Sequence, residues 1–293
     1  MNEKRPILNN DIDASLLPPR PRDSHKGTFG KVLLVAGSRD MAGAAYFAAK
    51  ACYRMGAGLC RILSVRENLP ILATLLPEAL LTGYDGDDPD LDVIAAAEEW
   101  ADVLVIGCGM GTAPASRRIL SFLLRRSAKP RVLDADALNL LAASPSLFKY
   151  TEGAILTPHA MEAARLLDTT PEEIEKDRIA AVLSLSEKTG AVCVLKGHRT
   201  LITDGKGQIY QNETGNSALA TAGSGDVLAG MIGGLLAGSR SAPSFSPLTQ
   251  ARLGVCLHGL CGERASETLT EYSVMASDLV EALPHVLHGI INQ

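Results

Sequence analysis

The segment 212–238 combines glycines, an acid and an apolar helical pattern in an order that suits phosphate chemistry. Within it, Gly223, Ser224 and Gly225 directly precede Asp226 and an apolar helix. The first backbone N–H groups of a helix have no acceptor inside the helix, and the helix dipole is positive at that end. We therefore predict that these three residues form an anion hole for phosphate.

The acid at the start of this helix has two possible roles. Asp226 could cap the helix by accepting hydrogen bonds from its first backbone N–H groups. Alternatively, its carboxylate takes a proton from a hydroxyl group as a phosphoryl group is transferred to that hydroxyl. The glycines on its N-terminal side favour the second role, so Asp226 is the predicted general base.

Polar residues also follow three predicted buried strands. His159 comes just after an apolar run and is a candidate substrate contact. Glu162 either binds Mg²⁺ through water or is an ordinary acid in the first turn of a helix. Lys196 ends another apolar run, where a charge needs a phosphate or an ion-pair partner. Further acids lie in the segment 134–139.

Several familiar motifs are incomplete or absent. Gly107-Cys-Gly-Met-Gly111 resembles a dinucleotide fingerprint, but Thr112 replaces the third glycine, so we interpret it as a turn that lets a ligand approach the backbone. The chain has no GxxxxGK[ST] run and no HExxH motif. His285 and His288 share one helix face and are interpreted as surface or packing residues.

The composition restricts the class of protein. The 293 residues carry a formal charge of −5, and 46% of them are hydrophobic. A mildly acidic chain lacks the basic stripe of a general nucleic-acid binder, and we find neither a membrane-spanning run nor a secretory signal. Six cysteines without CxxC spacing indicate buried free thiols in a reducing compartment. We expect a cytoplasmic enzyme with no nucleic-acid or membrane partner.

Apolar runs alternate with helical patterns along most of the chain. The predicted strands are 31–36, 59–65, 101–106, 131–134, 154–157 and 191–196, with a hairpin at 200–203 and 208–210. The predicted helices are 43–55, 114–126, 160–167, 171–189, 226–237, 248–269 and 276–291. This alternation predicts an α/β fold with a mostly parallel, doubly wound sheet and ligands beyond the carboxyl ends of its strands.

Taken together and in order, the motifs resemble those of the ADP/ATP-dependent NAD(P)H-hydrate dehydratases. The set comprises His25-Lys-Gly-Thr-Phe-Gly-Lys31, Gly56-Ala-Gly58, Gly107-Cys-Gly-Met-Gly111, Asp134-Ala-Asp-Ala-Leu-Asn139, Thr157-Pro-His159, Lys196-Gly197, Gly215-Asn216, Gly223-Ser-Gly-Asp226 and His258-Gly259. The resemblance covers roughly residues 23–283. It implies a ribokinase-like, three-layer α/β/α fold and a Mg²⁺-dependent repair of nicotinamide nucleotides.

The implied reaction dehydrates the S epimer of hydrated NADH or NADPH (NADHX or NADPHX) and converts ADP to AMP, or ATP to ADP, with release of phosphate. The resemblance assigns substrate contacts to Ala44, Gly109, His159 and Asp226. It assigns nucleotide contacts to Lys196, Gly197, His198, Arg199, Thr200 and Gly225. Cys108 stands where the family often has proline, and Ser224 and His198-Arg199 also depart from the common pattern.

We expect an N-terminal arm, 1–24, and a single catalytic domain, 25–293. Many relatives carry an additional epimerase domain, which needs roughly 200 more residues. We therefore expect a separate NAD(P)HX epimerase as pathway partner, or spontaneous epimerisation, and, by family habit, a homo-tetramer. Two alternatives remain open: a kinase of small thiamine precursors with the same fold, and a non-catalytic nucleotide-binding regulator.

Overall fold

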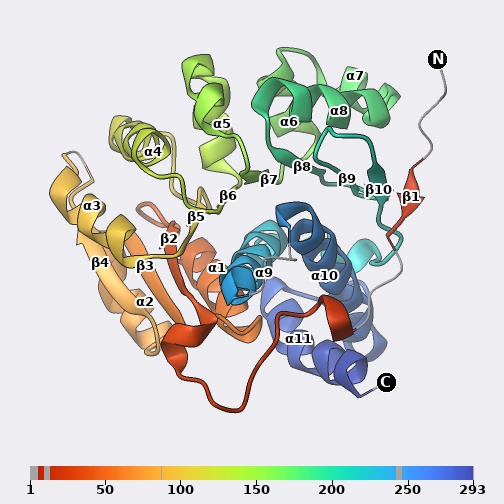
Figure 1. The fold of residues 1–293 in the computed structure, drawn as a ribbon, viewed down its shortest axis with the longest axis horizontal. Helices are drawn as coiled ribbons and strands as arrows, with labels where there is room; N and C mark the ends of the chain where they lie inside the picture. The colour runs from red at the N-terminus through yellow and green to blue at the C-terminus, as the bar shows by residue number, and fades with distance from the viewer. Residues whose placement is uncertain (1–5, 10–13, 87, 242–245, 293) are drawn as a thin grey trace.

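The computed structural model describes residues 6–9, 14–86, 88–241 and 246–292. These residues form a ten-stranded sheet in the order β1-β10-β9-β8-β7-β6-β5-β2-β3-β4, and helices cover both of its faces (Figure 1). Only the pairings of β9 with β8 and β10 are antiparallel. The predicted mostly parallel α/β/α architecture is confirmed.

The strands and helices have the following bounds. The strands are β1 (Ile7–Leu8), β2 (Lys31–Val35), β3 (Leu59–Val65), β4 (Leu80–Tyr84), β5 (Val103–Ile106), β6 (Arg131–Leu133), β7 (Ile155–Leu156), β8 (Val192–Leu195), β9 (Leu201–Thr203) and β10 (Ile209–Gln211). The helices are α1 (Ala42–Arg54), α2 (Leu69–Leu75), α3 (Leu91–Trp100), α4 (Pro114–Arg126), α5 (Asp136–Ala142), α6 (Ala160–Leu167), α7 (Pro171–Lys176), α8 (Arg178–Thr189), α9 (Ser224–Gly238), α10 (Pro247–Leu269) and α11 (Ala276–Ile291).

The direction of winding reverses between β2 and β5, in the middle of the sheet. The chain proceeds from β2 outward to β4, returns to β5 beside β2, and then proceeds the other way through β6, β7 and β8. In open α/β sheets, ligands bind at the carboxyl ends of the strands where the winding reverses. Backbone hydrogen bonds from Gly37 N to Cys108 O (2.9 Å) and from Ser38 N to Gly109 O (2.6 Å) join the loops that follow β2 and β5.

Apolar side chains fill both sides of the sheet. On one face, α3, α4, α5, α6 and α8 pack over residues such as Leu33, Leu104 and Leu133. On the other face, α1, α2, α9 and α10 cover alternate residues of the same strands, including Leu34 and Val105. Helix α11 packs outside α9 and α10 through Leu279, Val280 and Leu283. Strands with both faces covered read as continuous apolar runs, as observed in the sequence.

Glycines allow α9 to lie directly against α1. A Cβ atom added at Gly230 would stand 2.1 Å from the carbonyl oxygen of Ala48, and one at Gly234 would stand 2.7 Å from that of Cys52. Such distances leave no room for any side chain. The close packing fixes the position of α9, and with it the position of Asp226 in its first turn.

The structure corrects the sequence prediction at three places. The single helix expected at 171–189 is two helices, because Asp177 (φ −145°, ψ 80°) leaves the helical region and caps α8 through Ala180 N. The elements α2, β4, α3 and α5 were not predicted. Strand β1 belongs to the predicted N-terminal arm yet pairs in parallel with β10 at the sheet edge. The arm and domain boundary at residue 24 stays a prediction.

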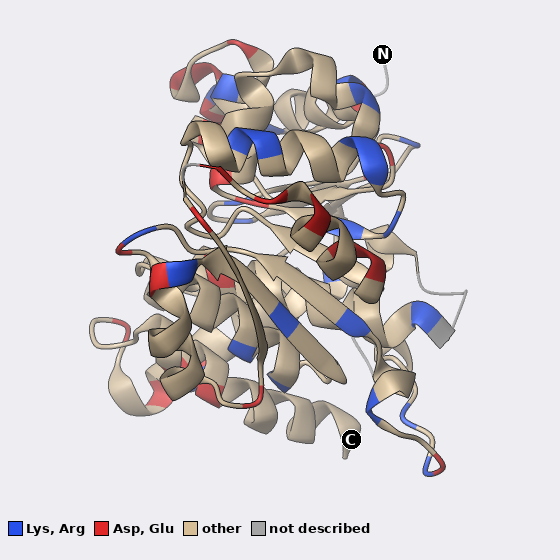
Figure 2. Cartoon of the chain, turned by 90° about the vertical axis from the view of Figure 1, so that its left-hand side faces the viewer, with Lys and Arg blue, Asp and Glu red and all other residues tan. Residues whose placement is uncertain are grey.

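Acidic and basic residues are interspersed on the side that carries α3 and α4 (Figure 2). Within the described part of the chain, no helix is both long and apolar enough to cross a membrane. All six cysteines are buried and free, as predicted.

Candidate functional site

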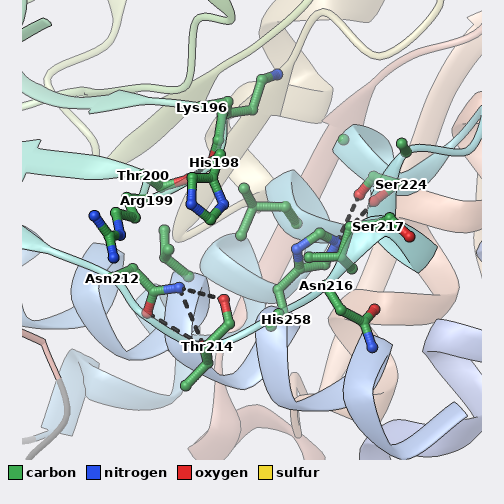
Figure 3. A pocket seen from close by; sticks show the side chains of 18 of the residues that line it. Lys196, His198, Arg199, Thr200, Asn212, Thr214, Asn216, Ser217, Ser224 and His258 are labelled. Atoms are coloured by element: carbon green, nitrogen blue, oxygen red, sulfur yellow. Dashed lines mark hydrogen bonds between the residues drawn. The ribbon is translucent and has the colours of Figure 1, made fainter. Parts of the chain in front are cut away.

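A cavity of about 920 Å³ lies at the carboxyl end of β8 and beside the N-terminus of α9 (Figure 3). One wall is the loop 196–200, and the opposite wall comes from α9 and α10. The segment that follows β10 closes the space between them. The residues that line it are His159, Lys196, Gly197, His198, Arg199, Thr200, Asn212, Glu213, Thr214, Gly215, Asn216, Ser217, Leu219, Ala220, Thr221, Ser224, Gly225, Leu228, Val255, His258 and Gly259.

All six residues predicted to contact the nucleotide thus line one cavity. They come from two chain segments, 196–200 and the first turn of α9, which the fold brings to opposite sides of the same space. The predicted substrate contact His159 also reaches this cavity. Ala44, Gly109 and Asp226 do not line it.

Lys196 ends a buried strand and was expected to need an ion-pair or phosphate partner; the structure gives it an ion pair with Asp134. Its Nζ lies 2.8 Å from Oδ1 of Asp134 and 3.9 Å from Oε2 of Glu162. Burial by itself would lower the pKa of Lys196, but the two carboxylates outweigh burial and raise that pKa. The ammonium therefore stays charged at neutral pH, and it stands at the edge of the cavity, where an anionic ligand can reach it.

Asp226 does not cap its helix. The N-cap of α9 is Gly223, in the left-handed region at φ 87°, and no side chain caps this helix. The carboxylate of Asp226 instead lies in a cluster with Cys108 and Asp134, whose donor atoms are all within 4.8 Å of one another. Burial raises the pKa of Asp226 to about 6, and the charge of Asp134 adds to the rise. A carboxylate with a raised pKa is a stronger base than one in water.

The first turn of α9 is held from outside by α10. His258 Nε2 lies 3.1 Å from the Ser224 hydroxyl and 3.0 Å from the Ser224 carbonyl oxygen (Figure 3). Burial lowers the pKa of His258 to about 4, so the ring is neutral at physiological pH. The backbone N–H of Ser224 donates to the Thr221 carbonyl at 3.3 Å. The N–H groups of Gly225 and Asp226 follow in the same turn, before the first bond within the helix.

His159 and Glu162 form a reciprocal capping pair at the start of α6. The His159 Nδ1 atom accepts hydrogen bonds from the backbone N–H of Met161 and Glu162, which places the ring proton on Nε2. Glu162 returns a bond through Oε2 to the His159 N–H at 2.9 Å. Burial raises the pKa of Glu162 to about 7. In this arrangement Glu162 acts as a first-turn acid; its predicted role as a magnesium ligand stays a prediction.

Ala44 and Gly109 pack against each other beside the loops that follow β2 and β5. A Cβ atom added at Gly109, which has φ 58°, would stand 2.7 Å from the Cβ of Ala44. Gly109 directly follows Cys108, whose side chain hydrogen-bonds to Asp226. Asp226 therefore lies between Cys108, next to Gly109, and Gly225, which lines the cavity.

The carboxylates of Asp134 and Asp226 suit Mg²⁺ better than they suit a softer metal. Mg²⁺ prefers oxygen ligands and usually keeps several waters beside one or two carboxylates and the phosphates of a nucleotide. Asp134 and Asp226 supply two carboxylates within 4.8 Å of each other. The Cys108 thiol, whose pKa burial raises well above its usual value, stays protonated and is no ligand for this ion.

Sequence reasoning left several residues of the site without a role. Asp134 was noted only as an acid at a strand end, but it pairs with Lys196 and accepts a 2.7 Å hydrogen bond from Thr157 Oγ1. Ala135, next to it, has a positive φ of 49° without being glycine, a strain that is typical of functional sites. Asn212 and Val255 also line the cavity. Asn212 begins the segment 212–238 that the sequence singled out but had no role there, and no motif marked Val255, because its place beside the cavity arises from tertiary packing.

Comparison with known proteins decides the family. The family model for NAD(P)H-hydrate dehydratase matches residues 32–285. The chain belongs to the NAD(P)H-hydrate dehydratase family. An ADP-dependent (S)-NAD(P)H-hydrate dehydratase of Neisseria meningitidis is 42% identical over 85% of this chain and 81% of its own length.

Solved structures of the family share the fold. A ribokinase-like protein of Enterococcus faecalis superposes with a TM-score of 0.82 at 32% identity, covering 96% of both chains. The ADP/ATP-dependent NAD(P)H-hydrate dehydratase of Bacillus subtilis, crystallised with ATP and Mg²⁺, superposes with a TM-score of 0.80 at 31% identity, covering 94% of both chains. The predicted ribokinase-like fold is confirmed. The chain spans about half the length of the bifunctional NAD(P)H-hydrate repair enzymes that it also matches.

Proposed function

We propose that this chain dehydrates the S epimer of NADHX or NADPHX to NADH or NADPH, with ADP or ATP as co-substrate. The observation that carries the proposal is the position of Asp226. Its carboxylate, with a pKa raised to about 6, lies beside Cys108 and Asp134 and directly follows Gly225, which lines the cavity of the predicted nucleotide contacts. Family membership supports the same reaction.

The proposed chemistry overcomes the poor leaving ability of hydroxide. Asp226 takes the proton of the ring hydroxyl as that oxygen attacks the terminal phosphoryl group of the nucleotide. The N–H groups in the first turn of α9, around Gly223 to Gly225, stabilise the charge on the transferring phosphoryl oxygens. Phosphate is then a good leaving group, and the lone pair of the ring nitrogen expels it to give an iminium ion. Loss of a proton from the adjacent ring carbon then forms the C=C double bond of the reduced nicotinamide.

Two groups of residues would hold the two substrates. Lys196 to Thr200 and Gly225 would contact the nucleotide, with the Lys196 ammonium facing its phosphates. Ala44, Gly109 and His159 would contact the hydrated dinucleotide, as the family resemblance implies. Asp134 would hold Mg²⁺, with Glu162 acting through water, so that the Asp226 carboxylate stays free to take the proton. When bound, this ion supplies positive charge that offsets the charge of the phosphates.

A direct assay tests the proposal. The purified chain is incubated with the hydrated cofactor, Mg²⁺ and either ADP or ATP, and the absorbance of reduced nicotinamide is followed. We expect recovery only when a nucleotide is present, with release of phosphate equal to the NADH or NADPH formed. Absence of recovery with both nucleotides, together with phosphorylation of a thiamine precursor, would replace the proposal by the kinase alternative.

The regulator alternative makes the opposite prediction for Asp226. A protein that only binds nucleotide needs no general base, so Asp226→Asn would leave its behaviour unchanged. The buried, raised-pKa carboxylate at the start of α9, beside the cavity of the predicted nucleotide contacts, favours catalysis, because perturbed pKa values gather at catalytic sites.

The proposed reaction needs a supply of the S epimer and a cellular compartment in which to act. A separate NAD(P)HX epimerase, or spontaneous epimerisation, would supply the S epimer from the R epimer. The chain would act in the cytoplasm as a homo-tetramer.

A further inference from the structure

The amino-terminal segment is part of the sheet that carries the nucleotide cavity. Strand β1 pairs in parallel with β10, placing Ile7 beside Tyr210 and Leu8 beside Gln211. The backbone N–H of Asn9 continues the ladder to the Gln211 carbonyl oxygen at 2.8 Å. The residue after β10 is Asn212, which lines the cavity. This segment therefore borders the strand from which one cavity wall begins.

The side chain of Asn9 is fully buried and connects two elements. Its Oδ1 accepts a hydrogen bond of 2.9 Å from Arg252 Nε, and its Nδ2 donates to the Arg252 carbonyl oxygen at 3.0 Å. Nδ2 also lies 3.5 Å from Oδ1 of Asn212. Arg252 belongs to α10, and its guanidinium stacks 3.6 Å from the Tyr210 ring of β10. One amide thus ties α10 to the end of β10.

The next hydrogen bonds along this network reach the cavity itself. Asn212 Nδ2 donates to the carbonyl oxygen of Thr214 at 2.9 Å and to its hydroxyl at 3.1 Å (Figure 3). The Thr214 hydroxyl bonds to the Cys256 carbonyl oxygen of α10 at 3.0 Å. Asn212 and Thr214 line the cavity on one side, and Val255 and His258 of α10 line it beside them.

We propose that Asn9 is a positioning residue for nucleotide binding: it fixes the wall formed by Asn212, Thr214 and α10, although it does not line the cavity itself. The inference rests on the proposed nucleotide site. Without the Asn9 amide, Arg252 Nε loses its acceptor, and the wall gains conformational freedom that nucleotide binding must then remove. Asp226 makes no hydrogen bond within this network, and His258 of α10 holds its turn at Ser224 independently of Asn9, so we expect the chemical step to keep its rate.

The test compares nucleotide affinity with turnover in the full chain. We expect Asn9→Ala to raise the Kd for ADP, measured by calorimetry without the hydrated cofactor, by about 3- to 10-fold. The KM for ADP should rise in parallel, while kcat at saturating ADP and the KM for the hydrated cofactor stay near wild type. Ile7→Ala is the matched control, because Ile7 lies on the same strand, is 44% exposed and has no part in the network.

Two outcomes overturn the inference. An unchanged Kd for ADP shows that Asn9 does not influence the cavity, and an equal fall in kcat shows a general structural role. If Asn9→Ala does not fold, Arg252→Lys removes the Nε donor of the same hydrogen bond from the α10 side. For that variant too, an unchanged Kd for ADP or an equal fall in kcat would overturn the inference. Because ADP binding is measured without the hydrated cofactor, a failure of the proposed dehydratase activity leaves this test intact.

Discussion

At the scale of single residues, burial determines what the charged groups of the site can do. Asp226 lies at the first turn of a helix, where an exposed carboxylate would have a lowered pKa. Its burial beside Asp134 raises the pKa to about 6 instead. Lys196, equally enclosed, keeps its charge because Asp134 pairs with it at 2.8 Å. Burial in the same surroundings therefore makes Asp226 a stronger base, while the ion pair with Asp134 keeps Lys196 positively charged.

Replacing the carboxylate tests the role of Asp226. Asp226→Asn keeps the size of the side chain and removes its capacity to accept a proton, so we expect kcat to fall by about 100-fold or more. The Kd for ADP should change little. Initial rates and calorimetry measure the two quantities. Asp168→Asn, at the exposed end of α6, is the control and should match wild type. Full turnover in Asp226→Asn would remove the general base from the mechanism.

Glu162 gives a prediction about stability and pH. Its pKa is about 7 in the folded chain and 4.5 in an unfolded one, so its ionisation opposes folding. The stability that it contributes is complete below pH 4.5 and is lost as pH rises through 7. Glu162→Gln keeps an acceptor for the His159 N–H but cannot ionise.

We therefore expect Glu162→Gln to be more stable than wild type at pH 8, on the order of 1–3 kcal/mol, and to show no such gain at pH 4.5. Urea unfolding at both pH values, without nucleotide or Mg²⁺, measures the difference. A stability difference that is the same at both pH values would show that Glu162 does not ionise in this range.

At the scale of elements, the contact between α1 and α9 controls the position of the first turn of α9, which carries Asp226. Ala48 and Cys52 of α1 present their carbonyl oxygens to Gly230 and Gly234 of α9. A helix that approaches another at backbone distance has no side chains between them that could adjust. Any added volume must therefore move α9 as a whole, together with Asp226.

Gly230→Ala tests this rigid contact. The new methyl group would meet the Ala48 carbonyl oxygen at 2.1 Å, so we expect a loss of about 1–3 kcal/mol in the free energy of unfolding. A fall in kcat should accompany it. Gly289→Ala in α11 is the matched control, because nothing lies within 4 Å of its added Cβ. Denaturant unfolding and initial rates decide; equal behaviour of the two variants would contradict the packing argument.

At the scale of the whole molecule, apolar side chains gather between α10 and α11. Leu269 is 39% exposed, Met275 is 60% exposed and Tyr272 is fully exposed. These three residues lie close together in the chain at the end of one helix and the start of the next. Large apolar side chains grouped on a surface are typical of an interface between chains.

The homo-tetramer that we propose would bury these side chains. Light scattering on the purified protein should then give a mass about four times the 30.9 kDa of the chain. Tyr272→Glu should lower that mass, because a charge cannot be buried in an apolar contact without a partner. Ser184→Glu, on the exposed side of α8, is the control and should leave the mass unchanged. A monomer at every concentration would contradict the assembly.

The sequence alone determined the architecture and most of the site. Alternating apolar runs predict the parallel sheet because a strand covered on both faces must be apolar throughout. The order of the glycine and acid motifs predicts the family, and the loop 196–200 and Gly225, which the resemblance assigns to the nucleotide, line one cavity in the structure. That this cavity binds a nucleotide stays a prediction. The helices and strands between 69 and 100 escaped prediction because their patterns are short and half-exposed.

Only the tertiary structure decided how these parts act on one another. The sequence left Asp226 between a helix cap and a base; the fold places its carboxylate against Cys108 and Asp134, and Gly223 takes the N-cap position. The sequence likewise placed Asn9 in an arm without a role, whereas the sheet edge brings it to Arg252. The burial of Asp226 and the pairing of Asn9 with Arg252 depend on residues far apart in the chain. A local sequence pattern therefore cannot predict them.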